Sequence, residues 1–195
     1  DRYEKTNGHC DVLVAGGGIA GLMAALQAGR SGARVILADE QNEFGGWLLG
    51  ESDVTIDGTS AADWIASAVA ELSAMPEVTL LPRTTVFGYM DHNYLTLTER
   101  VTDHLGERPS HLPRQRMWKV RAGQTVLAQG AHERPLVFSG NDLPGVMLSG
   151  AVRSYINRYG VVPGNRTVVF TNNDDAYRTA WALHGAGARV VAVDP

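Results

Sequence analysis

The chain has 195 residues, of which 44% are hydrophobic and 19% charged, with a net charge of −4. This is the composition of a globular chain long enough to bury a sizeable core, and it excludes an intrinsically disordered protein. The sequence has no lysine and arginine block and no apolar run of membrane-spanning length, which argues against a nucleic-acid partner and against a membrane. The single cysteine, Cys10, excludes an internal disulfide and a CxxC pair, so we expect a cytoplasmic, reducing compartment.

The first forty residues predict two parallel strands joined by a helix. Residues 11–15 form an apolar run, residues 18–29 favour a helix, and ARVILADE (33–40) is typical of a buried strand. A helix between two strands makes the strands parallel, and the length fits one βαβ unit.

A glycine-rich turn, GGGIAG (16–21), joins the first strand to the helix and matches the pattern G-x-G-x-x-G. In this pattern Gly16 allows the tight turn, Gly18 lets a pyrophosphate approach the backbone, and Gly21 lets the helix pack closely on the strand. The turn therefore predicts a dinucleotide site.

Further groups of the same site follow from this placement. The amides of Ile19 and Ala20 at the helix N-terminus are the expected phosphate donors. Asp39 lies at the end of the second strand, at the spacing of the acid that binds ribose hydroxyls. The next residue, Glu40, is not basic, so we expect an unphosphorylated adenosine, in NAD or FAD and not in NADP.

Two segments beyond Asp39 allow two interpretations each. Gly45 and Gly46, before Trp47, are expected either to line the part of the site that binds the pyrophosphate or to form a flexible loop. Val86, in TTVFG, offers its backbone to the adenine edge, and its side chain is expected in the core.

The middle of the chain predicts a helix and a series of strands. A helix starts after Thr59 or Ser60 and runs to about residue 74, with Trp64 on its apolar face. Ser149 is a candidate cap for another helix through residue 158. The expected strands are two short ones around Pro82, a hairpin of residues 93–101 and 116–122, a separate strand at 125–131, and two more at 166–173 and 188–195 flanking a helix at 174–187.

The last three elements form a second βαβ unit whose turn lacks the glycine pattern. Asp174 and Asp175 stand at its helix start, where carboxylates cap the helix and repel a pyrophosphate. We therefore expect no second nucleotide there.

Other reactive residues predict no catalytic or metal site. Cys10 is expected to be a packed residue, Glu133 to be exposed or paired at an interface, and Trp181 to lie in the core. The histidines are scattered, so no metal cluster is expected.

TVLAQGA (125–131) resembles the ATGA element of the glutathione-reductase-like flavoproteins with two dinucleotide domains, where a hairpin insertion precedes that element. Gln129 replaces the usual threonine, and Gly130 is kept. Residues 3–25, 83–95 and 130–180 are together similar to the alpha subunits of heterotetrameric sarcosine oxidases, and this resemblance covers essentially the whole chain.

The resemblance implies a nucleotide, partners and a reaction. It implies NAD in the first nucleotide fold, and FAD and covalent FMN on the beta subunit and its interface. It implies beta, gamma and delta subunits and a tetrahydrofolate domain later in the chain. The reaction converts sarcosine, oxygen and tetrahydrofolate to glycine, hydrogen peroxide and methylenetetrahydrofolate. The NAD contacts fall on Ala20, Asp39, Glu40, Gln41, Trp47 and Val86.

We therefore expect an α/β, Rossmann-like FAD/NAD(P)-binding fold of three layers with a β-hairpin insertion (1–140), followed by a partial, degenerate second nucleotide-binding fold (141–195). The ends of the sequence suggest part of a longer polypeptide, which alone is not catalytic. Two alternatives stay open: a self-sufficient oxidoreductase with FAD in the same pocket, and an assembly module with an empty pocket.

Overall fold

The computed structural model describes residues 2–194. Its residues form two compact units, and the residues of each unit contact mainly residues of the same unit. The first unit contains residues 2–46 and 62–130, and the second contains residues 47–61 and 131–194. Residues 1 and 195, the outer ends of the two expected domains, lie outside the described residues. The expected domain division at residue 140 stays a prediction.

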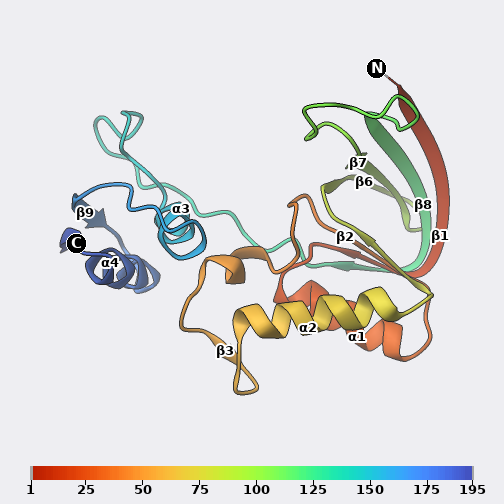
Figure 1. Cartoon of the computed structure of the whole chain (residues 1–195), viewed down its shortest axis with the longest axis horizontal. Helices are drawn as coiled ribbons and strands as arrows, with labels where there is room; N and C mark the ends of the chain where they lie inside the picture. Colours follow the sequence, from red (N-terminus) through yellow and green to blue (C-terminus); the bar gives the residue numbers. More distant parts are fainter. Residues whose placement is uncertain (1, 195) are drawn as a thin grey trace. The chain divides into compact units, whose positions relative to one another are not determined.

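A six-stranded mixed sheet in the order β5-β2-β1-β8-β7-β6 organises the first unit (Figure 1). β1 pairs in parallel with β2 and β8, β2 pairs in parallel with β5, and the β7 pairings with β6 and β8 are antiparallel. Its strands are β1 (Tyr3–Ala15), β2 (Val35–Ala38), β5 (Val78–Leu81), β6 (Thr84–Met90), β7 (Tyr94–Arg100) and β8 (Gln115–Leu127). The predicted first βαβ unit, the strands around Pro82 and the antiparallel hairpin are confirmed.

The two central strands are longer than the sequence pattern predicted. β1 begins at Tyr3 and not at residue 11, and β8 joins the expected strands 116–122 and 125–131 into one. The pairing of β1 with β8 explains both differences, because it runs from Tyr3 opposite Gln115 to Ala15 opposite Leu127. Polar residues in one strand find partners more than a hundred positions away, and no local pattern shows this.

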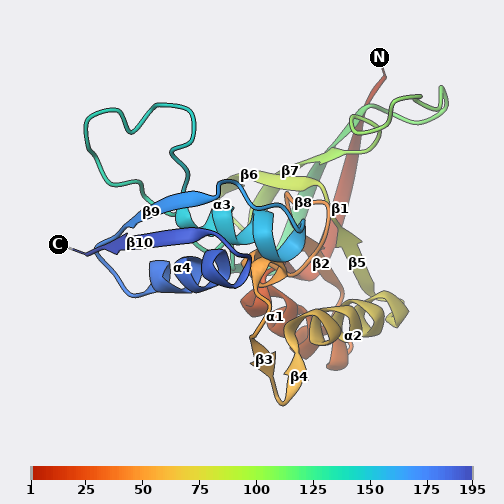
Figure 2. The ribbon, with the colours of Figure 1, turned by 60° about the vertical axis from the view of Figure 1, so that its left-hand side comes forward.

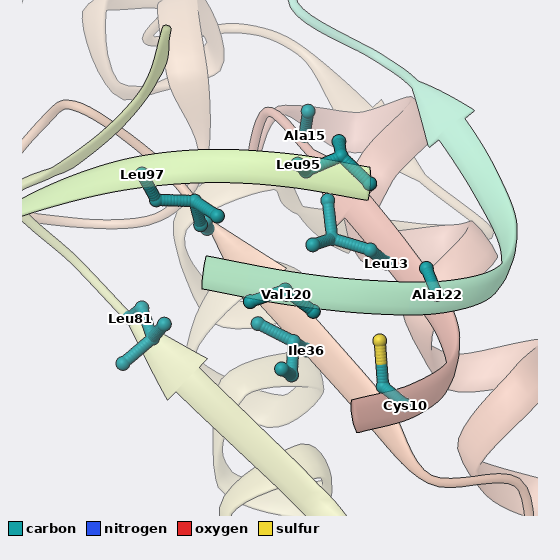
Figure 3. Packing of buried hydrophobic residues seen from close by; sticks show 10 residues of the cluster. Cys10, Leu13, Ala15, Ile36, Leu81, Leu95, Leu97, Val120 and Ala122 are labelled. Carbon is teal, nitrogen blue, oxygen red and sulfur yellow. The ribbon is translucent and has the colours of Figure 1, made fainter. Parts of the chain in front are cut away.

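The sheet curls so that one of its faces packs on itself. Leu13, Ile36 and Leu81 from the parallel half meet Leu95 and Val120 from the hairpin half in one buried cluster (Figure 3). The hairpin insertion is therefore the outer half of the same sheet, and it forms one of the expected three layers. Removing this apolar surface from water stabilises the curl by about 25 cal/mol per Å².

Helices α1 (Ile19–Arg30) and α2 (Ala61–Ala74) run side by side on one side of the sheet (Figures 1 and 2). The buried positions of α2 include Ile65, Ala68 and Leu72, whose spacing is that of one helical face. Trp64 is half-buried on this helix. The predicted amphipathic helix after Ser60 is thus confirmed.

The second unit contains the predicted second βαβ. It contains all but the first residue of a 3₁₀ turn (Gly46–Gly50), and the short hairpin β3 (Thr55–Ile56) and β4 (Thr59–Ser60). Its other elements are α3 (Ser149–Arg153) continued by a π-helical turn (Ser154–Arg158), β9 (Arg166–Phe170), α4 (Asp175–Gly185) and β10 (Arg189–Val193). β9 and β10 are parallel, and Val169, Ala180 and Leu183 belong to the buried cluster beside them.

The expectation that Trp181 is a core residue is wrong, because 69% of its surface is exposed. Thr179, Ala180 and Leu183 occupy the buried face of α4, and Trp181 follows Ala180 by one position, about 100° around the helix. In residues 2–194, no helix has the length and apolar character needed to span a membrane.

Candidate functional site

The glycine turn brings three pieces of backbone into close contact. Gly16 has a φ of +105°, and a β-carbon on it would overlap the carbonyl of Ala128 after β8. A β-carbon on Gly21 would overlap the carbonyl oxygen of Gly16, so the helix lies against the turn without space for a side chain. Glycine is therefore required at both positions for steric reasons.

Gly18 differs from these two glycines because its Cα faces open space. No heavy atom lies within 4 Å of a β-carbon built on it. Gly18 is the N-cap of α1, with no side-chain cap bond and no acidic residue in the first turn. Ile19 and Ala20, which follow it, are exposed. The N-terminus of α1 thus presents backbone N–H groups and a partial positive charge to the space above Gly18.

Asp39 is fixed at the end of β2 beside the glycine turn. Its Oδ2 accepts a hydrogen bond from the N–H of Gly17 at 2.5 Å, and its Oδ1 accepts one from the N–H of Gln41 at 2.7 Å. The residue is 9% exposed. Each carboxylate oxygen has a second lone pair, so Asp39 keeps the capacity to accept hydrogen bonds from ribose hydroxyls.

The segment after β2 packs back onto the turn. The N–H of Gly45 donates to the carbonyl of Gly17 at 2.7 Å, and a β-carbon on Gly46 would lie 3.0 Å from the Cα of Gly18. Phe44 is buried against Gly17. This contact favours the interpretation that Gly45 and Gly46 line the site. The following residue, Trp47, is 61% exposed and is the first residue of the second unit.

A hollow of about 560 Å³ lies next to the end of β2. It is lined by Glu40, Gln41, Asn42, Arg83, Thr85 and Arg100. Val86 follows in β6, the edge strand, and its side chain packs on the buried cluster as expected. Its backbone pairs with Leu97 on one side, and a contact with adenine on the other side stays a prediction.

Gly130 ends the first unit with a φ of +69° and open space at its β-carbon position. Before it, the N–H of Ala128 donates to the carbonyl of Ala15 at 2.8 Å, which places residue 128 over Gly16. The structure thus gathers the glycine turn, Asp39, Gly46 and the start of α1, while the role of each as a ligand contact stays a prediction.

Sequence reasoning missed Gly17, whose N–H bonds to Asp39, and four residues that line the hollow: Asn42, Arg83, Thr85 and Arg100. For Gly17 a signal was available, because the residue between the two pattern glycines points its N–H at the acid. Arg100 had none, since it lies 60 positions from the residue that it contacts.

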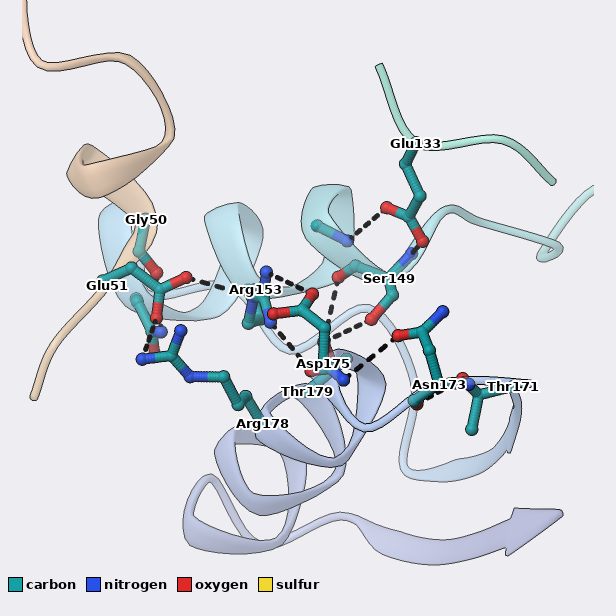
Figure 4. Close-up of polar contacts among 12 residues, drawn as sticks. Gly50, Glu51, Glu133, Ser149, Arg153, Thr171, Asn173, Asp175, Arg178 and Thr179 are labelled. Carbon is teal, nitrogen blue, oxygen red and sulfur yellow. Dashed lines mark hydrogen bonds and ion pairs between the residues drawn. The ribbon is translucent and has the colours of Figure 1, made fainter. Parts of the chain in front are cut away.

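The second βαβ turn is closed by its own side chains (Figure 4). Asn173 Oδ1 accepts a hydrogen bond from the N–H of Asp175 at 3.1 Å, and Thr171 Oγ1 accepts one from the N–H of Asn173 at 3.1 Å. Asp174 is the N-cap of α4 but makes no side-chain cap bond. The two expected carboxylates are therefore at the start of α4, but the side chain that bonds to a backbone N–H of its first turn is that of Asn173.

Glu133 caps α3 from outside that helix. Its two carboxylate oxygens accept hydrogen bonds from the N–H groups of Ser149 and Gly150, each at 2.8 Å (Figure 4). The expectation that Ser149 caps the helix is wrong: Leu148 is the N-cap, and the Ser149 hydroxyl contacts that of Thr179 at 2.6 Å. A charged carboxylate from a distant segment replaces the expected neutral cap.

A buried ionic cluster fastens residues 50–51 to α3 and α4. Arg153, whose side chain is 8% exposed, contacts Glu51 at 3.3 Å and the Asp175 carboxylate at 3.0 Å, and Arg178 contacts Glu51 at 3.5 Å (Figure 4). Burial raises the pKa of Glu51, and the two arginines oppose this rise. With two acids and two arginines the cluster is formally neutral, which suits its structural position.

Cys10 is a buried member of the sheet cluster, which confirms its expected packing role. Burial, with the negative charge of Asp11, raises its pKa to about 11, so the thiol stays protonated near neutral pH. In the described residues, no group of three or more histidine, cysteine or acidic side chains could hold a metal ion.

Comparisons with known proteins agree with this geometry. The chain is 54% identical over 193 residues to sarcosine oxidase subunit alpha of Rhizobium meliloti (strain 1021), covering 99% of this chain and 20% of that protein. It is 52% identical over 193 residues to sarcosine oxidase subunit alpha of Corynebacterium sp. (strain P-1), covering 98% of this chain and 20% of that protein. The chain therefore spans about a fifth of the length of these relatives.

The fold is similar to that of L-proline dehydrogenase from P. horikoshii, with a TM-score of 0.78, 22% identity, and coverage of 100% of this chain and 37% of that one. This likeness confirms the Rossmann-like, FAD/NAD-binding type of fold. The model of the family described as FAD dependent oxidoreductase matches residues 11–139, from the last residues of β1 to the segment after β8. That match spans more than half of the sequence, and the chain belongs to the FAD dependent oxidoreductase family.

Proposed function

We propose that this chain is the NAD-binding region of the alpha subunit of a multisubunit sarcosine oxidase. In this proposal the complete enzyme converts sarcosine, oxygen and tetrahydrofolate to glycine, hydrogen peroxide and methylenetetrahydrofolate. FAD and FMN belong to partner subunits, the complex contains beta, gamma and delta subunits, and tetrahydrofolate binds a later domain of the same polypeptide.

The similarity to two sarcosine oxidase alpha subunits over nearly the whole chain is the observation that carries the proposal. Because the chain corresponds to a fifth of those proteins, the substrate, the partners and the reaction are part of the proposal. The chain's membership in an oxidoreductase family and its nucleotide-binding fold support the same assignment.

The residues present fit a dinucleotide. The space above Gly18 is open while Gly16 and Gly21 exclude any side chain, so a pyrophosphate has access to the backbone at the start of α1. Asp39 is oriented by two backbone N–H groups and keeps lone pairs that can accept hydrogen bonds from ribose hydroxyls. When bound, NAD supplies hydride-transfer chemistry at its nicotinamide ring.

In this proposal the chain's own residues bind and orient the nucleotide, and the amine is oxidised elsewhere in the complex. The amides at Ile19 and Ala20 donate to the phosphates, and Asp39, Glu40 and Gln41 surround the adenosine ribose. The proposal assigns no role in electron transfer to Cys10, which is buried and whose pKa is raised to about 11.

A second candidate is a flavoprotein in its own right, with FAD in the same pocket. The description of the matched family, FAD dependent oxidoreductase, favours it. NAD and FAD share an ADP moiety, so the turn at Gly18 and the acid Asp39 serve either cofactor.

Identifying the bound nucleotide separates these candidates. The chain is purified alone, its visible spectrum is recorded, and the nucleotide released by denaturation is identified by chromatography and mass. We expect NAD and no flavin absorption. Released FAD would support the flavoprotein instead, and a chain that neither carries nor takes up either nucleotide would indicate an assembly role. Sarcosine-dependent oxygen consumption by the whole complex, with another N-methyl amino acid as control, tests the substrate.

A further inference from the structure

The turn that carries Asp39 is fastened to the base of the hairpin by its carbonyl groups. In the segment 39–41, the first and third carbonyls accept hydrogen bonds from the backbone N–H groups of Thr84 and Arg83, at 2.7 Å each. The middle carbonyl, that of Glu40, accepts its bond from a side chain, Nη2 of Arg100, at 2.6 Å. Of these three bonds, only the one from Arg100 can be removed by changing a side chain.

The peptide unit between Glu40 and Gln41 links Arg100 to Asp39. Its carbonyl accepts the hydrogen bond from Arg100, and its N–H donates to Asp39 Oδ1 at 2.7 Å. A peptide unit is planar, so fixing its carbonyl also fixes the direction of its N–H. Without Arg100 the carbonyl of this unit loses the bond that fixes its direction, so the N–H that donates to Asp39 Oδ1 is held less firmly.

We propose that Arg100 is a positioning residue for ribose recognition, acting on Asp39 through the Glu40–Gln41 peptide. This inference rests on the proposed nucleotide site. Arg100 is the last residue of β7, and its backbone N–H donates a hydrogen bond to the carbonyl of Arg83 at 3.0 Å. The strand end is thus held independently of the guanidinium, whose role is at the turn.

The geometry predicts an effect on one hydroxyl of the ligand. An acid at the end of the second strand recognises the ribose 2′-hydroxyl. A site built to bond a hydroxyl rejects the analogue that lacks it, whereas a site that has lost its orientation discriminates less. Loss of Arg100 therefore weakens the preference for ADP over 2′-deoxy-ADP.

The test measures the dissociation constants of ADP and 2′-deoxy-ADP for the complete polypeptide with its subunits, freed of nucleotide. In the wild type we expect 2′-deoxy-ADP to bind about tenfold more weakly than ADP. In Arg100→Met we expect ADP to bind about 3- to 10-fold more weakly than in the wild type, and the ratio between the two ligands to fall to about 2.

Arg121→Met is the matched control. Arg121 lies on the same hairpin, is also exposed, and donates from its guanidinium to the backbone carbonyls of Asp91 and His92 at 3.3 and 3.0 Å. This variant removes the same type of bond away from the turn, and we expect the wild-type affinities and ratio.

Arg100→Lys separates positioning from attraction, because lysine keeps the positive charge but not the planar fork. We expect a ratio between those of the wild type and Arg100→Met. Equal weakening of both ligands, with the ratio unchanged, would overturn the inference and leave Arg100 as a charge or a fold contact. If Arg100→Met does not fold, the ratio in Arg100→Lys decides alone.

The outcomes also distinguish this inference from the proposed function. A wild type that binds ADP with the expected ratio, beside an Arg100→Met with the same ratio, rejects the role of Arg100 only. A wild type that binds neither ligand rejects the nucleotide site and this inference with it.

Discussion

The N-termini of the helices in the two units differ although both units contain a βαβ. In the first unit, α1 begins at Gly18 with no side-chain cap, no acid in its first turn and open space above it. In the second unit, Asn173 bonds to the first turn of α4, and Glu133 bonds to that of α3. The same strand–helix connection is therefore left open for an anion in one unit and closed by the protein in the other.

The difference shows that the architecture alone does not make a nucleotide site. Both turns connect parallel strands through a helix. A ligand needs N–H groups that the chain does not itself satisfy, and it needs backbone that can be approached. Of the turn after β1 and the turn after β9, only the glycine turn after β1 meets both conditions.

The largest effect is expected on the stability of the second unit, when its buried ionic cluster is broken. Arg153→Met removes the partner of Glu51 and Asp175 in a cluster where the side chain of Glu51 is 3% exposed. Leaving a buried charge with no partner costs about 3–5 kcal/mol. Because Arg178 still contacts Glu51 at 3.5 Å, we expect the second unit to lose about 3 kcal/mol, the lower end of that range. Hydrogen exchange of residues 131–194 measures it. Arg189→Met, at an exposed arginine, is the control, and equal losses in both variants would contradict the role of the cluster.

Two alanine substitutions in the open turn should separate packing from binding. Gly21→Ala forces a methyl group onto the carbonyl of Gly16, and we expect a loss of about 1–3 kcal/mol in the free energy of unfolding. Gly18→Ala adds its methyl to open space, so we expect a stability change of no more than about 1 kcal/mol. Denaturant unfolding gives both values.

Nucleotide titration gives the complementary result for Gly18→Ala. We expect binding to weaken about tenfold or more, because the methyl group occupies the path of the pyrophosphate. Unchanged affinity in a folded Gly18→Ala would show that the nucleotide does not approach the backbone there.

An acid placed at the open end should make α1 resemble α4. Ile19 is 39% exposed in the first turn, and Ile19→Asp puts a carboxylate where α4 has Asp175. Relative to Ile19→Asn, we expect about 0.3–1 kcal/mol more stability from the helix dipole and about tenfold weaker dinucleotide binding. Both differences should shrink at high salt. If the two variants bind equally, the phosphates are not at this helix end.

The smallest effect concerns stability in acid. As the pH falls, the Asp11 contribution to stability decreases in the first unit, whereas the Glu51 contribution increases in the second. The Arg34 side chain and N–H bond to Asp11 and lower its pKa from 3.8 to about 2. This lowered value stabilises the first unit above about pH 4, and the contribution disappears as the pH falls toward 2. We expect Asp11→Asn to be less stable than the wild type at pH 6 and equal to it near pH 2.

Glu51 in the second unit acts in the other direction, because its raised pKa makes the folded state bind the proton more tightly than the unfolded state. Its protonation therefore adds stability as the pH falls. A steeper acid loss in Asp11→Asn than in the wild type would contradict the sign for the first unit.

Much of the fold could be predicted because its signals are local. The apolar run before Gly16, the helix after it and the buried strand at residues 35–38 are each visible within a few residues. The full length of β1 and the single strand β8 could not be predicted, because polar residues such as Tyr3 become strand residues only through partners near Gln115. Trp181 was misplaced because apolar spacing on a short helix does not show which face is covered.

The same division applies to the site. The positions of Gly16, Gly21 and Asp39 follow from fixed spacings, since each serves one turn between two adjacent strands. Glu133 and Arg100 could not be predicted, because each contacts its partner across a fold that must already exist. Side chains that act on backbone carbonyls or N–H groups at long range leave no pattern in the sequence.

The pairing of β1 with β8 has a consequence for how the chain is made. These strands, Tyr3–Ala15 and Gln115–Leu127, are neighbours in the sheet. More than a hundred residues must therefore be synthesised after β1 before its partner β8 is complete. At roughly 5–20 residues per second, this synthesis takes about 10 seconds. Until β8 is made, the neighbour of β1 in this sheet is β2, which pairs with Val12–Ala15. The other edge of β1 stays available to chaperones or to another nascent chain. A slow, non-local closing step should therefore limit the rate at which this protein folds.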